Sequence, residues 1–153
     1  MNLLQAAAMF ASMEQGLHHA EHAALERAAV IVETEAKAEI GTYQPDAGPF
    51  AAWAELQDST KRDRVAKGFP ENEPLLRTGE MRDSVEHTVK MDFGPGGVAH
   101  IGSDSLIAVY QELGTVRIPA RHFLGGAAFR KEREVQQVLG HGVVAMLGGQ
   151  RIT

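Results

Sequence analysis

Three histidines within five residues, His18, His19 and His22, form the first group in this sequence that could do chemistry. On a helix, His18 and His22 lie on one face, and Glu14 could supply a third metal ligand. The zinc-protease motif requires Glu directly after the first His, and His19 occupies that position. A solvated face of an acidic helix explains these residues without a metal. We therefore expect no metal site and no cofactor.

Three serines could act as nucleophiles if a histidine lay beside one of them. Ser84, Ser103 and Ser105 are candidates, and His87 and His100 could lie across a hairpin from each other. No GxSxG elbow surrounds any of the serines. Ser103 and Ser105 stand where helix caps or turn residues are expected. We therefore expect that the protein is not an enzyme and has no catalytic residues, with a small metal- or serine-dependent hydrolase as the alternative.

Two arginines, Arg117 and Arg121, bracket the sequence Ile-Pro-Ala. The planar fork of arginine favours sites where it meets carboxylates. The chain supplies many carboxylates, including Glu112 and those of the N-terminal segment. The sequence therefore predicts that Arg117 and Arg121 form ion pairs within or between subunits.

The composition is that of an ordinary globular domain. The chain has 153 residues, of which 44% are hydrophobic and 23% charged, and this length indicates a single domain, 1–153. Absence of cysteine excludes disulfides and cysteine-based sites, and fits a reducing compartment. No apolar run reaches the ~18 residues of a membrane span. The N-terminus lacks the basic segment of a signal peptide.

The net charge of −5 is unevenly distributed. Residues 1–53 hold seven acids and two bases, whereas residues 93–153 hold four acids and six bases. No basic stripe runs along the chain, so specific binding to a nucleic-acid backbone is not expected.

The first 40 residues are expected to form one long acidic helix. They contain no proline, and Gly16 is the one glycine at which the helix could break. Gly41 is a natural stop. A stripe at helical spacing predicts the buried face. Its members are Phe10, Met13, Leu17, Ala20, Ala24, Ala28 and Ile31.

The segment 41–74 is expected to be a loop with a buried anchor and a short helix. Trp53 is the only tryptophan, and it lies among glycine and proline residues. Asp58, Ser59 or Thr60 can cap a helix that ends at Gly68. The charged side chains of this helix indicate a solvated face. They are Lys61, Arg62, Asp63, Arg64 and Lys67.

An antiparallel hairpin is expected after residue 75. Thr78 can cap one helical turn over 80–84. Apolar and polar residues alternate over 85–91, and 98–103 can form the second strand, with the glycine-rich segment 93–97 as the turn.

A short helix over 106–113 is expected next, with caps available in 103–105. Gly114 should end it with a positive φ. The segment 115–118 can form another strand, which Pro119 would end.

The last expected element is a C-terminal helix. It should run over 124–139 within a region extending from 120 to 147, and Gly140 and Gly142 leave its continuation open. Helix, loop, hairpin, short helix and helix together predict an α+β domain in which the long N-terminal and C-terminal helices pack on a small antiparallel sheet.

Three stretches together resemble the neck and tail-completion proteins of tailed bacteriophages, also called virion morphogenesis proteins. They are GPFAAWAELQDST (48–60), PLLRTGEMRDSV (74–85) and HIGSDSLIAVYQELGTVRIPARHFLGGAAF (100–129). The shared pattern is WxxL, then LxxTGx(L/M)xxS(I/V), then a strand ending in GS, and finally Tyr with E-L/F-G-T and IPARxFL. His122 departs from this pattern, because that position is often proline.

The resemblance implies a structural virion protein at the head–tail junction. Such proteins resemble one another in forming rings, commonly six-fold, that join the DNA-filled head to the tail or complete the upper end of the tail. The implied partners are further copies of the chain and the neighbouring connector and tail-end proteins, with DNA passing through the channel without specific binding. Synthesis in the host cytoplasm and no membrane contact are implied too. A small regulatory binding domain is the other alternative.

A closing ring needs two different faces that meet. We expect an acidic face of the N-terminal helix to meet a basic C-terminal face of the next subunit. The residues assigned to this interface are Glu14, Glu21, Glu33, Arg117, Arg121, Arg130 and Arg133. The residues expected to be critical for the fold are Trp53, Gly79, Gly114, Pro119 and Phe123.

Overall fold

The computed structural model describes residues 2–92 and 96–148. Helix α1, Leu3–Glu39, runs unbroken through Gly16, so the predicted long helix is confirmed and the possible break is absent. A capping box begins it: Asn2 Oδ1 accepts the Gln5 N–H at 2.8 Å, and Gln5 Oε1 accepts the Asn2 N–H at 3.0 Å. Gly41 follows the helix with a φ of 103°, as expected for a stop.

The predicted hairpin is present. Strands β1, Val85–Met91, and β2, Gly97–Ser103, pair antiparallel, with His87 opposite Ile101. The alternating side chains of β1 are buried or half-buried on one face and exposed on the other, which confirms the period of two. Residues 93–95 of the predicted turn lie outside the described residues.

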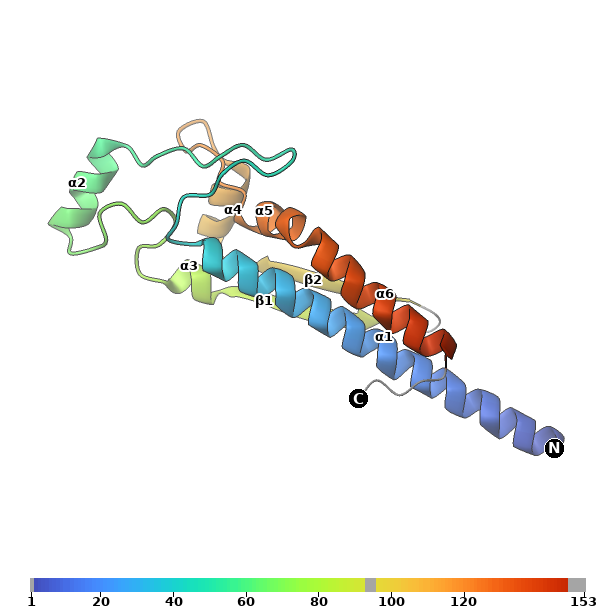
Figure 1. Ribbon diagram of the computed structural model, residues 1–153. Helices are drawn as coiled ribbons and strands as arrows, with labels where there is room; N and C mark the ends of the chain where they lie inside the picture. Colours follow the sequence, from blue (N-terminus) through green and yellow to red (C-terminus); the bar gives the residue numbers. More distant parts are fainter. Residues whose placement is uncertain (1, 93–95, 149–153) are drawn as a thin grey trace.

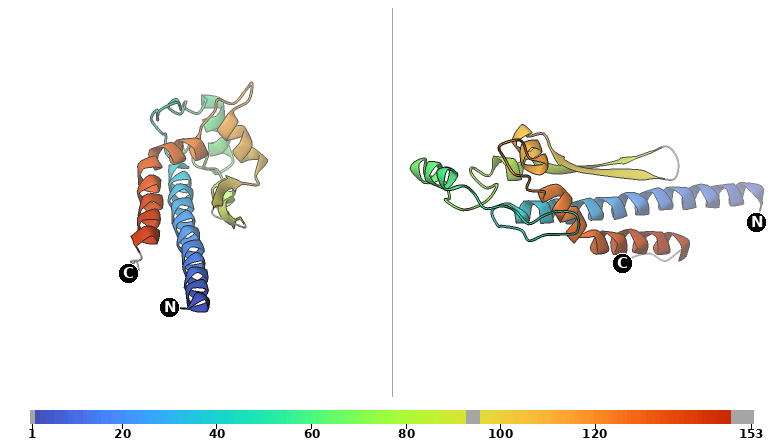
Figure 2. Two further views of the ribbon diagram at one scale, coloured as in Figure 1. Left: turned by 90° about the vertical axis from the view of Figure 1, so that its right-hand side faces the viewer. Right: turned by 90° about the horizontal axis from the view of Figure 1, so that it is seen from above.

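Helix α1 lies between the hairpin on one side and helix α6 on the other (Figures 1 and 2). The remaining helices are α2 (Asp58–Ala66), α3 (Glu80–Asp83), α4 (Leu106–Leu113), α5 (Phe123–Arg130) and α6 (Glu132–Gly148). Six helices and one two-stranded sheet in the described residues make an α+β fold, as predicted. None of these helices is long and apolar enough to span a bilayer.

The hydrophobic core surrounds the C-terminal end of α1. Phe123 is completely buried there and Trp53 is 6% exposed, so the expected burial of Trp53 is confirmed. Side chains from α1, α3, β1, α4 and α5 meet at this point. The cluster comprises Ala36, Ile40, Trp53, Met81, Val85, Ala108, Phe123 and Ala127.

The expected buried stripe of α1 is only half correct. Ala24 and Ala28 are buried, but Phe10, Met13 and Leu17 are exposed. The reason is tertiary, since α6 and the hairpin do not extend along the N-terminal part of α1 (Figure 1).

The predicted single C-terminal helix is also wrong in detail. The chain leaves the helix at Lys131 and re-enters it as α6, and α6 then continues through Gly140 and Gly142. A Cβ at Gly142 would lie 2.9 Å from the Cβ of Ala24. Glycine here serves the close approach of α6 to α1, and does not end the helix.

The strand expected over 115–118 does not exist. The Thr115 N–H donates to the carbonyl of Ile118 at 2.8 Å, and Thr115 Oγ1 accepts the N–H groups of Arg117 and Ile118. The segment therefore closes on itself as a turn, and Pro119 ends no strand.

Candidate functional site

The three stretches that carry the family resemblance converge on one groove. Its volume is about 740 Å³, and it lies between the loop before α2, the α3 region, and α4 with the segment after it. All of its lining residues except Asp63 and Arg64 belong to those three stretches. Segments separated by up to 67 residues thus contribute to a single surface feature at the end of the molecule opposite the N-terminus (Figure 1).

Arg121 holds one wall of this groove. Its side chain is 4% exposed. Nε and Nη2 donate to the carbonyl of Ala54 at 3.2 and 2.8 Å, and Nη2 also reaches the carbonyl of Glu55 at 3.4 Å. The segment before α2 forms no strand, so these bonds satisfy carbonyls that would otherwise lack partners. The predicted ion pair of Arg121 is therefore wrong, because its donors are used by backbone carbonyls.

Arg64 fixes the second wall in the same way. Its Nη1 donates to the carbonyls of Glu73 at 2.6 Å, Leu76 at 2.8 Å and Pro70 at 3.3 Å. The side chain is buried, which corrects its assignment to a solvated face. Burial lowers the pKa of both Arg64 and Arg121 from its ordinary value.

The predicted side-chain cap of α2 is absent too. The N-cap residue of α2 is Gln57, which makes no side-chain cap bond, and Asp58 already lies in the first turn. An acidic residue there interacts favourably with the helix dipole.

Helix α4 and the turn after it form the third wall. Gly114 ends α4 with φ 73° and ψ 170°, so its φ is positive as predicted. Its ψ differs from that of a left-handed helical stop, and the chain leaves in an extended direction. A Cβ at Gly114 would lie 2.8 Å from the backbone nitrogen of Ala120, so the turn needs glycine for space as well as for φ.

Gly79, like Gly114, has a positive φ at a helix end, in this case the start of α3. It is the N-cap residue and has a φ of 92°. The predicted cap by Thr78 is therefore wrong, because Gly79 is the N-cap residue, although Thr78 Oγ1 accepts the Glu80 N–H at 3.3 Å from the position before it.

The charges that line the groove are more positive than negative, and two of the negative groups are paired with cations. Four arginines and three carboxylates line it. The Asp63 carboxylate is paired with Lys67 at 2.6 Å and Arg77 at 3.5 Å, and Glu55 lies 3.6 Å from Lys61. The bond from Lys67 lowers the pKa of Asp63. Arg117 is exposed and forms no ion pair within the described residues.

Helix α4 also exposes apolar side chains beside the groove. Ala108 is its one buried residue, whereas Leu113 is 71% exposed. The exposed apolar residues of α4 and the adjoining turn are Leu106, Ile107, Val109, Tyr110, Leu113 and Val116. A clustered apolar face of this kind is typical of a protein–protein contact. In the sequence, this exposed surface was indicated by a short predicted helix whose apolar residues lie on every side, because a single core can cover only one of them.

Several residues assigned to an inter-subunit interface are engaged inside the chain. Arg121 is buried, as described above. Arg130 Nη1 lies 2.5 Å from Glu39 Oε1 and its Nη2 bonds the Pro45 carbonyl. Glu33 bonds Lys37 at 2.5 Å and also His87.

These pairings have a common physical cause. Glu33 and Arg130 lie where α1 meets another part of the fold, Arg121 lies against the loop before α2, and burial favours a partner over water. The assignment of Arg121 to the interface is therefore corrected, and Glu33 and Arg130 have internal partners. Glu14, Arg117 and Arg133 remain exposed and Glu21 is half-exposed, so their interface role stays a prediction.

The histidine cluster lies on the N-terminal part of α1. His19 and His22 are exposed and His18 is half-exposed. No group of three or more histidine or carboxylate side chains in the described part of the chain is arranged to hold a metal ion.

The candidate serines bond each other and the backbone. Ser84 Oγ lies 2.6 Å from Ser103 Oγ and donates to the Met81 carbonyl at 2.7 Å, and Ser103 Oγ accepts the Ser105 N–H. His87 bonds the carboxylates of Glu26 and Glu33 on α1. These contacts join β1, β2 and α1. They therefore give the serines and His87 a role in holding the fold together.

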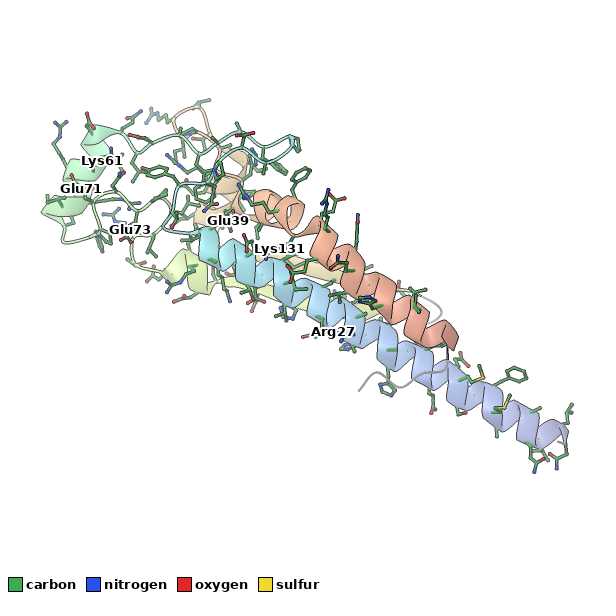
Figure 3. All side chains as sticks on the ribbon, in the orientation of Figure 1. Arg27, Glu39, Lys61, Glu71, Glu73 and Lys131 are labelled. Atoms are coloured by element: carbon green, nitrogen blue, oxygen red, sulfur yellow. The ribbon has the colours of Figure 1, made fainter. Side chains whose placement is uncertain are left out.

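Two partly buried polar contacts could not be recognised from the sequence. They are the pair of Arg130 with Glu39 and the contact of His87 with two glutamates of α1 (Figure 3 labels Glu39). Both join residues more than 50 positions apart. Their only signal was the position of His87 on the apolar side of β1.

No family model, curated protein or solved structure matches this chain.

Proposed function

We propose that this protein is a structural component of a tailed-bacteriophage virion. It acts at the head–tail junction, where a ring of copies, commonly six, joins the DNA-filled head to the tail or completes the upper end of the tail. Its partners are further copies of itself and the connector and tail-end proteins above and below. DNA passes through the ring without specific binding.

The observation that carries this proposal is the convergence of the three motif stretches on one groove. Apart from Asp63 and Arg64, all residues that line the groove lie within the three stretches that carry the resemblance. Two of its arginines use their donors to hold loops in place. The groove's surroundings are apolar and exposed on α4, which favours a contact with another protein over turnover of a small molecule.

The charge distribution supports the same proposal. Residues 1–53 are strongly acidic, so a channel near this part would repel the DNA backbone and let it pass.

Deletion of the gene from the phage that encodes the chain tests the proposal. Capsids should form and fill with DNA, but electron micrographs of the lysate should contain full heads without tails, or tails of abnormal length. Purified wild-type protein added to the lysate should restore joining. Normal infectious particles from the deletion strain would reject the proposal.

A double variant separates this role from hydrolysis. Ser84→Ala combined with Ser103→Ala removes the contact between these two serines, and it should still complement the deletion if the fold is retained. Loss of complementation by a folded Ser84/Ser103 variant would favour the hydrolase instead.

A further inference from the structure

The N-terminal part of α1 extends beyond the rest of the molecule. Ala24 is the first buried residue of this helix, and about 20 residues precede it, or about 30 Å of helix. In Figures 1 and 3 the N-terminal end of this helix extends past the ends of α6 and the hairpin, and its side chains radiate outward. Phe10 is 64% exposed, and Met13 and Leu17 are exposed as well. Such a surface is costly to leave in water.

The exposed residues form an ordered seam. Leu3, Ala6, Phe10, Met13, Leu17 and Ala20 follow one another in alternating steps of three and four residues. This is the spacing of a helix that packs along a partner. The next position in the series, Ala24, packs against Gly142 of α6. The seam therefore continues an existing helix–helix interface past the point at which α6 ends.

Acidic side chains flank this seam. Glu14 and Glu21 each follow a seam residue, Phe10 and Leu17, by one helical turn. Neither forms an ion pair within the described residues. The seam is thus apolar with a negative edge.

The opposite end of the molecule has a complementary surface. The exposed face of α4, represented by Ile107 and Leu113, lies beside the arginine-lined groove. Arg117 stands at the rim of the groove, exposed and free of ion pairs among the described residues. This surface is apolar with a positive edge.

We propose that residues 3–22 of one copy dock on the α4 face and groove of the next copy. The acidic edge of α1 then faces Arg117, and the apolar seam covers Ile107 and Leu113. A symmetric pairing of two α1 helices would bring the glutamates of both copies together and leave the α4 face uncovered. The helix cannot fold back onto its own groove, because the two lie at opposite ends of the molecule (Figure 1).

This contact gives the proposed ring its two different faces, and in that respect it rests on the proposed function. A helix about 30 Å long and 10 Å wide covers roughly 300 Å², less than the about 800 Å² per partner of a stable complex. A single contact is therefore weak, and closure of the ring stabilises it.

Cysteine cross-linking of the full-length chain tests the contact, because the natural chain has no cysteine. A Met13→Cys variant is mixed with a tagged Leu113→Cys variant under oxidising conditions. The mixed dimer should form about tenfold faster than with a Val98→Cys control, since docking raises the effective concentration of the two thiols. Val98 is a similarly exposed apolar residue on the hairpin, outside the proposed surface.

Charge reversal provides the second arm. Glu14→Lys with Glu21→Lys should slow the Met13–Leu113 cross-link several-fold, and so should Arg117→Glu in the partner. Combining the reversed helix with the reversed groove should restore the rate. All these residues are at least half-exposed, and circular dichroism of each variant verifies that its helices are retained.

Two results would overturn the proposal. One is a mixed dimer that forms no faster than the Val98 control. The other is a Met13→Cys homodimer as the fastest product, which would mean that two α1 helices pair symmetrically. These assays use the purified chain alone. A deletion strain that rejects the role in the virion would therefore not contradict the contact between copies, and absence of the cross-link would not contradict the role in the virion.

Discussion

The carboxylate of Glu112 accepts the backbone N–H of Leu124 at 2.9 Å, and its other oxygen accepts that of Gly125, also at 2.9 Å. Both donors lie in the first turn of α5, whose own N-cap residue, His122, makes no side-chain cap bond. A side chain of α4 therefore caps α5. Glu112 of the segment Glu-Leu-Gly-Thr, 112–115, thus has a structural explanation in this cap.

Glu112→Ala should destabilise the fold by about 1–2 kcal/mol, because two amides at a positive helix end lose their acceptor. Urea unfolding gives the free energy of unfolding. Glu71→Ala, at an exposed loop position, serves as the control and should change it by no more than about 0.5 kcal/mol. Equal stability of the two variants would contradict the capping role.

Trp53→Ala should cost about 3–5 kcal/mol, because it leaves a cavity in the cluster at the end of α1. Trp53→Phe should lose less, since it keeps most of the apolar volume. As the only tryptophan, Trp53 reports its own burial, and its emission should be blue-shifted and protected from quenchers. Red-shifted, fully quenchable emission in the folded protein would refute this packing.

Gly114→Val should destabilise by more than about 1 kcal/mol, because its φ is positive and its Cβ would contact the backbone of Ala120. Gly68→Val is the matched control, since Gly68 has a φ of 75° but open space around its Cβ position. The melting temperature should fall further for Gly114→Val. Equal falls would mean that backbone conformation alone, and not the close approach, sets the cost.

Glu39 should make stability depend on pH. Burial raises its pKa from 4.5 to about 7, against the opposing effect of the bond from Arg130. Over that interval the folded state retains a proton that the unfolded chain has released, so stability falls as pH rises from 4.5 through 7. Glu39→Gln should remove about 1–3 kcal/mol of this fall, measured by urea unfolding between pH 5 and 8. An identical pH profile for Glu39→Gln would exclude this origin.

His87 should also make stability depend on pH, with a loss that begins above pH 6.5. The bonds to Glu26 and Glu33 raise its pKa above 6.5. Its stabilising contribution is therefore present below pH 6.5 and lost as pH rises through the folded-state pKa. His87→Gln should lower stability at pH 6 and have a much smaller effect at pH 8.5. A loss of equal size at both values would show that packing, and not charge, explains the role of His87.

Glu33 has the opposite dependence. Burial alone would raise its pKa, but the bonds from Lys37 and His87 outweigh burial and hold the pKa below 4.5. Its contribution is present above pH 4.5 and lost as pH falls through the folded-state pKa. Glu33 thus contributes to the stability lost in acid, as does Asp63, whose pKa is also lowered, whereas His87 contributes to the stability lost above pH 6.5.

The sequence determined the local features of this protein. The unbroken helix over residues 3–39, the alternation of β1 and the positive φ of Gly114 follow from propensity, periodicity and the absence of a side chain, which act between near neighbours. Burial of Trp53 follows from the large free energy of removing a lone aromatic side chain from water.

Only the tertiary structure decided which elements meet. It exposed Phe10 and buried Ala24 on one stripe, because α6 and the hairpin cover only part of α1. It used Gly142 for close packing, and it turned Arg64 and Arg121 inward to hold loops whose carbonyls had no strand partner. Periodicity specifies a helix face, but burial depends on a partner that lies far away along the chain. The groove therefore exists only in the folded molecule, although the stretches that line it can be recognised in the sequence.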